Sequence, residues 1–121
     1  MKKMLIIDDS AYGRKLIRTA VTKLGINVTG EAESGAEGVE KYKELSPDIV
    51  TIDLAMDKMD GVETLKQILA YDANAYVLIL SSVAGQEAVA HEAVELGAKH
   101  VFDKPLNMFK FQLFAEEEGL I

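Results

Sequence analysis

The chain has 121 residues, a length that suits one compact domain and is too short for two. Hydrophobic residues make up 49% of it, which argues against disorder, and the absence of cysteine excludes disulfides and thiolate metal sites. A formal net charge of −7 makes binding to a nucleic-acid backbone unfavourable. No stretch approaches the roughly 18 apolar residues of a membrane span. We therefore expect a cytoplasmic protein that binds neither nucleic acid nor membrane.

Short apolar segments alternate with longer amphipathic ones. The apolar runs predict strands at 4–7, 27–32, 49–52, 77–80 and 100–102. Helical spacing of apolar residues predicts four helices between them, and Asn107 is expected to cap a fifth. Capping patterns mark two helix starts, Ser34 with Glu37 and Asp60 with Glu63. The residues expected to face the sheet are Ile17, Ala20, Val21 and Leu24 in the first helix, Ala36, Val39 and Tyr42 in the second, Val62, Leu65, Ile68 and Leu69 in the third, and Val89, Ala93 and Leu96 in the fourth.

Strands that alternate with helices predict βαβ units with right-handed crossovers and a parallel sheet. The first, third and fourth strands are the most apolar and belong at the centre of the sheet, whereas the second and fifth suit its edges. The expected strand order is therefore 2-1-3-4-5. This is the flavodoxin-like α/β fold, a (βα)5 three-layer sandwich, and we expect residues 1–121 to form it as one domain.

Polar side chains follow the strands where an open parallel sheet binds its ligands, outside the carboxyl ends. Asp8 and Asp9 end the first strand, Asp53 ends the third, Ser81-Ser82 follow the fourth and Lys104-Pro105 follow the fifth. One carboxylate at a strand end is usually a helix cap, but three together repel one another unless a cation lies among them, and oxygen ligands suit Mg²⁺. With a metal ion and Lys104 nearby to neutralise charge, Asp53 can attack a phosphoryl group.

These residues, with Met56, Met59-Asp60-Gly61 and Gly97-Ala98, resemble the receiver domain of response regulators over essentially the whole chain. Segments 40–44 and 46–51 resemble its chemotaxis, CheY-like branch.

The resemblance implies a role for each residue of the site. Asp53 would be the phosphoacceptor, and Asp9 and Asp53 would ligate Mg²⁺ directly together with the main-chain carbonyl of Ala55. Asp8 would hold the metal mostly through water. Lys104 would pair with the phosphoryl group, and a hydroxyl at the end of the fourth strand would move to bond it.

Two serines compete for the role of that hydroxyl. Counting forward from Asp53 favours Ser81, whereas counting back from Lys104 favours Ser82. The family places the hydroxyl directly after the apolar strand with a small residue next, and on that ground we choose Ser81.

Two positions depart from the family pattern. Asp57 stands where a proline is common and adds a charge to the loop after Asp53. Val101, on the expected switch face, stands where the family usually has the Tyr or Phe that changes rotamer on activation. Its neighbour Phe102 would face the other side of the sheet. The departure at Val101 bears on the aromatic switch and leaves phosphorylation untouched.

We therefore expect a stand-alone switch that acts by binding, and not an enzyme that turns over external substrates. We expect a sensor histidine kinase as phosphodonor, and a flagellar or archaellar motor component or its adaptor as target. A phosphorelay intermediate or a regulator outside motility is the alternative. A phosphatase acting through an aspartyl phosphate would need a second acid for the leaving group, and a flavodoxin-like cofactor binder would not place Asp8-Asp9 where a phosphate binds. A degenerate receiver would have lost an acidic residue or the lysine.

Overall fold

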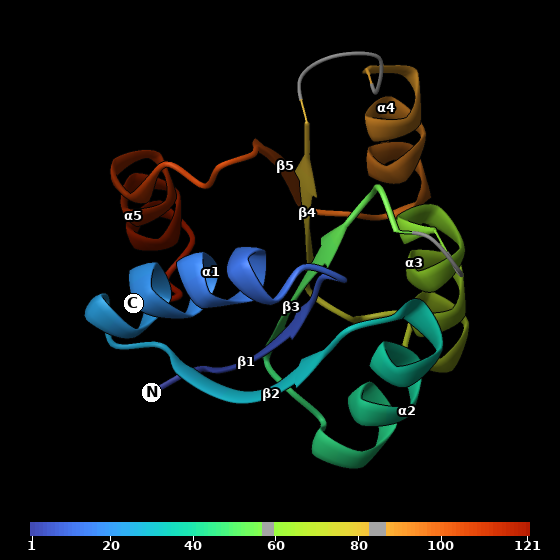
Figure 1. Cartoon of the computed structure of the whole chain (residues 1–121), viewed down its shortest axis with the longest axis horizontal. Coiled ribbons are helices and arrows are strands. Elements are labelled where there is room, and N and C mark those ends of the chain that lie inside the picture. The colour runs from blue at the N-terminus through green and yellow to red at the C-terminus, as the bar shows by residue number, and fades with distance from the viewer. Residues whose placement is uncertain (57–59, 83–86) are drawn as a thin grey trace.

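The computed structural model describes residues 1–56, 60–82 and 87–121, which form five strands and five helices in strict alternation (Figure 1). In chain order the elements are β1 (Lys3–Ile7), α1 (Ala11–Lys23), β2 (Asn27–Ala32), α2 (Gly35–Leu45), β3 (Ile49–Asp53), α3 (Gly61–Tyr71), β4 (Val77–Ser81), α4 (Glu87–Leu96), β5 (His100–Asp103) and α5 (Met108–Glu117).

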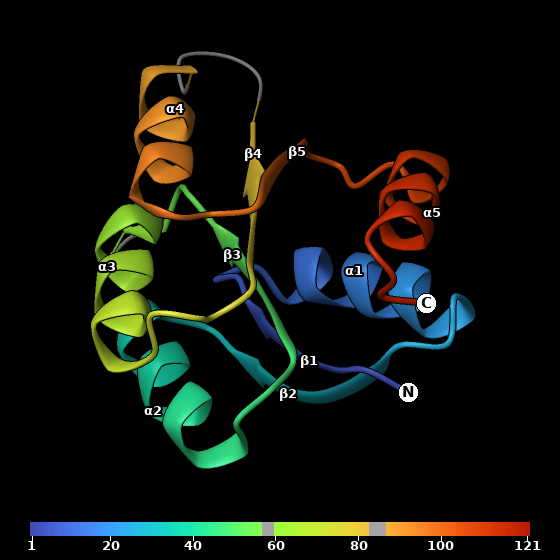
Figure 2. The same cartoon turned by 180° about the vertical axis from the view of Figure 1, so that it is seen from behind.

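The strands form one parallel sheet in the order β2-β1-β3-β4-β5, which confirms the predicted flavodoxin-like fold. Figures 1 and 2 show α1 and α5 on one face of the sheet and α2, α3 and α4 on the other, as a three-layer sandwich requires. The two edge strands are the partly polar ones, because an edge strand buries less of its surface than a central one.

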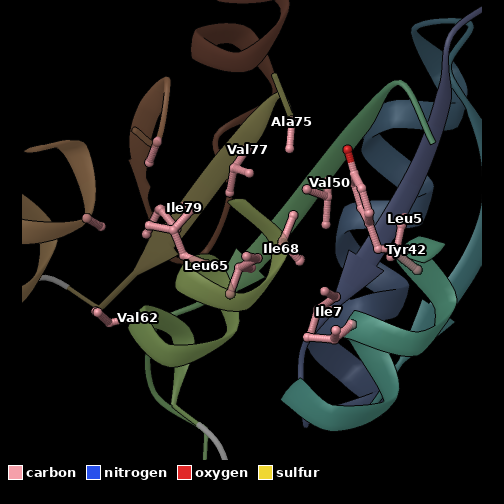
Figure 3. Packing of buried hydrophobic residues seen from close by; sticks show 14 of the residues in the cluster. Leu5, Ile7, Tyr42, Val50, Val62, Leu65, Ile68, Ala75, Val77 and Ile79 are labelled. Carbon is pink, nitrogen blue, oxygen red and sulfur yellow. The ribbon is translucent and has the colours of Figure 1, made fainter. Parts of the chain in front are cut away.

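Two apolar clusters fill the spaces between the layers. Figure 3 shows the cluster between the sheet and α2–α4, where Leu65 and Ile68 of α3 pack near Val77 and Ile79 of β4. The second cluster lies between the sheet and α1 and α5, and Phe111 is the largest of its fully buried side chains. Because successive residues of the central strands β1, β3 and β4 alternate between the two clusters, these three strands are buried on both faces.

The predicted helix starts are present, with one difference in detail. The side chains of Asp60 and Asn107 accept the N–H three residues further on, at 2.8 and 3.0 Å. Ser34 accepts from the N–H of Glu37 at 3.2 Å. The Glu37 carboxylate, however, accepts from the N–H of Glu33 at 2.7 Å instead of from Ser34 as a capping box predicts. The reciprocal bond is therefore made one residue before the cap.

The expected inward face of α4 is partly wrong. Ala93 is buried as predicted, but Val89 and Leu96 are 40% and 39% exposed, and the half-buried Ala90 packs against the core in their place. Because β5 is the edge strand, α4 covers the margin of the sheet, and the α4 residues that pack in the core, Ala90 and Ala93, are small. Ala36 of α2 is also exposed.

Among the helices of the described residues, none combines the length and the apolar character needed to cross a membrane.

We predict that Thr51→Val stabilises the domain. Thr51 lies in β3, is 2% exposed, and its hydroxyl has no hydrogen-bond partner within the described part of the chain. An unpaired buried hydroxyl costs about 1–3 kcal/mol, so the isosteric valine should raise the free energy of unfolding in urea by roughly 1 kcal/mol.

Thr64→Val is the matched control, because Thr64 is equally buried but donates to the carbonyl of Asp60 at 2.9 Å. It should lower stability. Destabilisation by both substitutions would show that the hydroxyl of Thr51 is satisfied.

Candidate functional site

Asp8 is held directly after β1 by its neighbours on both sides. Its N–H donates to the carbonyl of Ala32 at 3.0 Å, so the pairing of β1 with β2 continues one residue past the strand. Its carboxylate accepts the N–H of Ser10, the N-cap of α1, at 2.9 Å. Asp8 is fully buried, whereas Asp9 is exposed at the same edge. The first strand therefore delivers one buried and one accessible carboxylate.

Asp53 is the last residue of β3 and is 4% exposed. The chain beyond it is anchored on one side by a bond from the N–H of Leu54 to the carbonyl of Leu80 at 3.0 Å. On the other side, Gly61 opens α3 so close by that an added Cβ would lie 2.6 Å from the Cα of Leu54 and 2.7 Å from the carbonyl oxygen of Asp53. A side chain at Gly61 would collide with backbone that cannot yield, which explains the glycine after Asp60.

Lys104 directly follows β5 and places a positive charge next to these carboxylates. Its N–H donates to the carbonyl of Ser81 at 2.9 Å, which extends the pairing of β5 with β4 and fixes its backbone. Its ammonium nitrogen lies 3.0 Å from Asp53 Oδ2 and 3.2 Å from Asp8 Oδ2. One lysine therefore bridges two carboxylates that are distant in sequence.

The geometry fits the metal predicted from the sequence. Asp8, Asp9 and Asp53 offer carboxylate oxygens that lie within 4.8 Å of one another. The site offers few ligands, all of them oxygen, and is open to water on the Asp9 side. Such a site suits Mg²⁺, which keeps several of its waters when it binds a protein. Ala55 is exposed two residues after Asp53, and its N–H donates to Asp53 Oδ1 at 3.1 Å, which places its backbone next to the cluster. Its carbonyl remains the candidate ligand that the resemblance implies.

Burial shifts the ionisation of the central pair. The pKa of the Asp53 carboxyl lies above its ordinary value because burial, the largest influence, and repulsion from Asp8 together outweigh the hydrogen bond and charge of Lys104. Burial also acts to lower the pKa of Lys104, but the hydrogen bond and charge of Asp53, together with Asp8, raise it overall. The lysine is therefore protonated, whereas ionisation of Asp53 lowers the stability of the folded state.

The two residues expected to transmit the signal lie on the neighbouring strands β4 and β5. Ser81 ends β4, is 5% exposed, and donates its hydroxyl to the carbonyl of Ser82 at 3.0 Å, whereas Ser82 is exposed. Val101 is half-buried opposite Ile79 and packs against the α2–α4 side of the core. Phe102 belongs to the other cluster, as the strand alternation predicts.

The sequence interpretation missed Arg14, whose guanidinium Nη1 donates to the carbonyl of Asp8 at 2.7 Å. A single arginine in an amphipathic helix carries no signal of such a contact, because its other partner, Glu31, lies on β2. Asp57 and Met59, and the loop residues from Val83 to Gly85, lie outside the described residues.

Comparison with known proteins places this geometry in a family. The family described as the response regulator receiver domain matches residues 4–113. The chain belongs to the response regulator receiver family. It is 46% identical to the chemotaxis protein CheY of Thermotoga maritima over 104 residues, 86% of each chain, and 45% identical to CheY of Bacillus subtilis over 103 residues, 85% of each. The receiver is thus closely related to CheY.

A solved structure supports the same relation. The receiver superposes with a TM-score of 0.88 and 35% identity on a chain in the crystal structure of a CheX-CheY complex with BeF3 and Mg²⁺ from Borrelia burgdorferi, covering 99% of this chain and 90% of that one. The family and the fold that the sequence indicated are therefore confirmed.

We predict that Asp53→Asn and Asp9→Asn each raise the thermal midpoint in metal-free buffer. The native state disfavours the ionised Asp53, so removing its charge should increase the free energy of unfolding, and removing the charge of Asp9 should relieve repulsion in the cluster. A gain of about 1 kcal/mol corresponds to roughly 3–6 °C in a domain of this size.

Asp103→Asn is the charge-matched control, since Asp103 is exposed at the end of β5 and outside the cluster. It should leave the midpoint nearly unchanged. Added Mg²⁺ should stabilise the native protein by about 2.7 kcal/mol at 100 times its dissociation constant. If Asp103→Asn matched the other two, net charge and not clustering would be responsible.

Proposed function

We propose that the chain is the phosphoryl-accepting switch of a two-component system and that Asp53 is the phosphoacceptor. The observation that carries the proposal is the buried Asp53 carboxylate at the end of β3, bonded to Lys104 at 3.0 Å within a cluster of three carboxylates. A buried nucleophile with its own cation is what transfer of a charged group to a carboxylate requires.

In this reaction a carboxylate oxygen of Asp53 attacks the phosphorus of a phosphohistidine. The phosphorus–nitrogen bond breaks, and the imidazole nitrogen keeps the electron pair and takes up a proton. Lys104, already beside Asp53 Oδ2, is placed to pair with a phosphoryl oxygen. Mg²⁺, when bound, supplies charge neutralisation at the phosphoryl oxygens. Asp9, Asp53 and the carbonyl of Ala55 would hold the ion directly, and Asp8 would hold it through water.

The partners follow from the relatives. The similarity to CheY of Thermotoga maritima and Bacillus subtilis supports a chemotaxis-type sensor histidine kinase as donor and a motor component or its adaptor as target. The Borrelia burgdorferi relative is assembled with CheX, so a protein of that kind is a second candidate partner. We place the activity in the cytoplasm and propose that the chain acts by binding, without turnover of external phosphomonoesters.

The test is phosphorylation of Asp53→Asn. Acetyl phosphate with Mg²⁺ should add one phosphoryl group to the native protein, seen by intact mass, and none to the variant, because a carboxamide nitrogen is not a nucleophile. Asp103→Asn, which removes the same charge from an exposed position, should be phosphorylated normally. Phosphate retained on Asp53→Asn would disprove the assignment.

We predict that Ser81→Ala weakens the link between phosphorylation and the surface of α4, β5 and α5 without preventing phosphorylation. Ser81 is the buried hydroxyl at the strand end, and Lys104 is tied to its carbonyl, so a bond from Ser81 to a phosphoryl group would draw on the β4–β5 edge. Amide chemical shifts with and without a beryllofluoride mimic should show smaller changes in α4 in the variant.

Two further variants complete the comparison. Ser82→Ala should leave the shift changes intact, since Ser82 is exposed. Val101→Ala should affect them little, because a valine is too short to follow the hydroxyl and has few rotamers in a strand. Loss of the changes in Ser82→Ala alone would transfer the role from Ser81 to Ser82, and loss in Val101→Ala would show a side-chain relay through β5.

A further inference from the structure

We propose that Arg14 is a positioning residue for the magnesium site, acting on Asp8 and Asp9 through the backbone; this rests on the proposed function of the site. Arg14 lies in the first turns of α1, and its side chain is 16% exposed. Its Nη1 donates to the main-chain carbonyl of Asp8 at 2.7 Å. That carbonyl belongs to the peptide unit that joins Asp8 to Asp9, so Arg14 holds the plane from which the exposed Asp9 carboxylate departs.

Arg14 is itself held in place. Its Nε donates to Glu31 Oε1 of β2 at 3.2 Å, so one planar guanidinium spans a carboxylate on one element and a carbonyl on another. A rigid fork of donors suits this task better than a single flexible ammonium group. The link therefore ties the loop after β1 both to α1 and to β2.

Gly13, the residue before Arg14, lies against the carboxylate of Asp8. A Cβ at Gly13 would lie 2.7 Å from Asp8 Oδ2, the oxygen to which Lys104 donates, and 3.1 and 3.2 Å from the other two carboxylate atoms. Glycine is a poor choice inside a helix on propensity alone. Its presence is explained if the Asp8 carboxylate needs the space that a side chain would take.

A second arginine on the same helix separates positioning from charge. Arg18 also pairs with Glu31, and its Nε lies 2.6 Å from Oε2, yet it is 48% exposed and, within the described part of the chain, it makes no hydrogen bond or ion pair with Asp8. Removing either arginine deletes one positive charge near the site, which by electrostatics alone should strengthen Mg²⁺ binding. Positioning predicts the opposite sign for Arg14.

The experiment is calorimetric titration of the native protein and its variants with Mg²⁺, well below their thermal midpoints. Arg14→Gln should weaken Mg²⁺ binding about 10-fold, the order found when a residue that orients metal ligands is removed. Arg14→Lys keeps the charge but cannot span both partners, so its Mg²⁺ affinity should lie between those of the native protein and Arg14→Gln. Arg18→Gln should stay within about twofold of the native protein or bind more tightly. Amide shifts of Asp8 and Asp9 in metal-free protein should change in Arg14→Gln and not in Arg18→Gln.

Gly13→Ala is a second test that remains valid even if Arg14→Gln does not fold. It should weaken Mg²⁺ binding even though alanine favours the helix. Equal affinities for Arg14→Gln and Arg18→Gln, or an unchanged affinity in Gly13→Ala, would overturn the inference while the proposed function stood. No Mg²⁺ binding by the native protein, or binding that Asp53→Asn leaves unchanged, would overturn the proposed function as well.

Discussion

The site depends on one cation, the ammonium group of Lys104, which is shared between the buried carboxylates of Asp8 and Asp53. Both carboxylates have been removed from water and their negative charges repel one another, so without a counter-charge the pair would strongly destabilise the fold. Lys104 supplies that charge in the metal-free protein. The same ammonium group then lies where an acquired phosphoryl group would need it, so one residue serves both stability and chemistry.

The sheet makes this contact between distant residues reproducible. Lys104 is 96 residues from Asp8 and 51 from Asp53, yet each begins from a strand whose pairing continues past its end. The N–H groups of Asp8, Leu54 and Lys104 donate to carbonyls of neighbouring strands just beyond the regular ladder. Loops that start from such anchors can place side chains to within the tolerance that phosphoryl transfer requires.

What could be predicted from the sequence follows from the same geometry. Apolar runs that stop at polar residues mark strand ends, and in a parallel sheet all those ends meet at one edge, so Asp8, Asp53 and Lys104 could be grouped without a structure. The inward face of α4 could not, because Val89 and Leu96 have helical spacing and only the position of α4 over the sheet margin leaves them exposed. Arg14 was equally hidden, since its role depends on a carbonyl and on a partner in β2.

The two sides of the site are held differently, and this bears on how a switch would work. On the α1 side, Asp8 is bonded to Ser10, Arg14 and Lys104, and its N–H is paired with β2. These bonds leave it little freedom to rearrange when charge is added at Asp53. On the β4 side, the hydroxyl of Ser81 donates to the adjacent carbonyl of Ser82, and a phosphoryl oxygen could replace that carbonyl as the acceptor. A stronger, charge-assisted bond would favour that replacement. The displacement should therefore be taken up by β4 and the elements that follow it, while α1 and the metal ligands stay fixed.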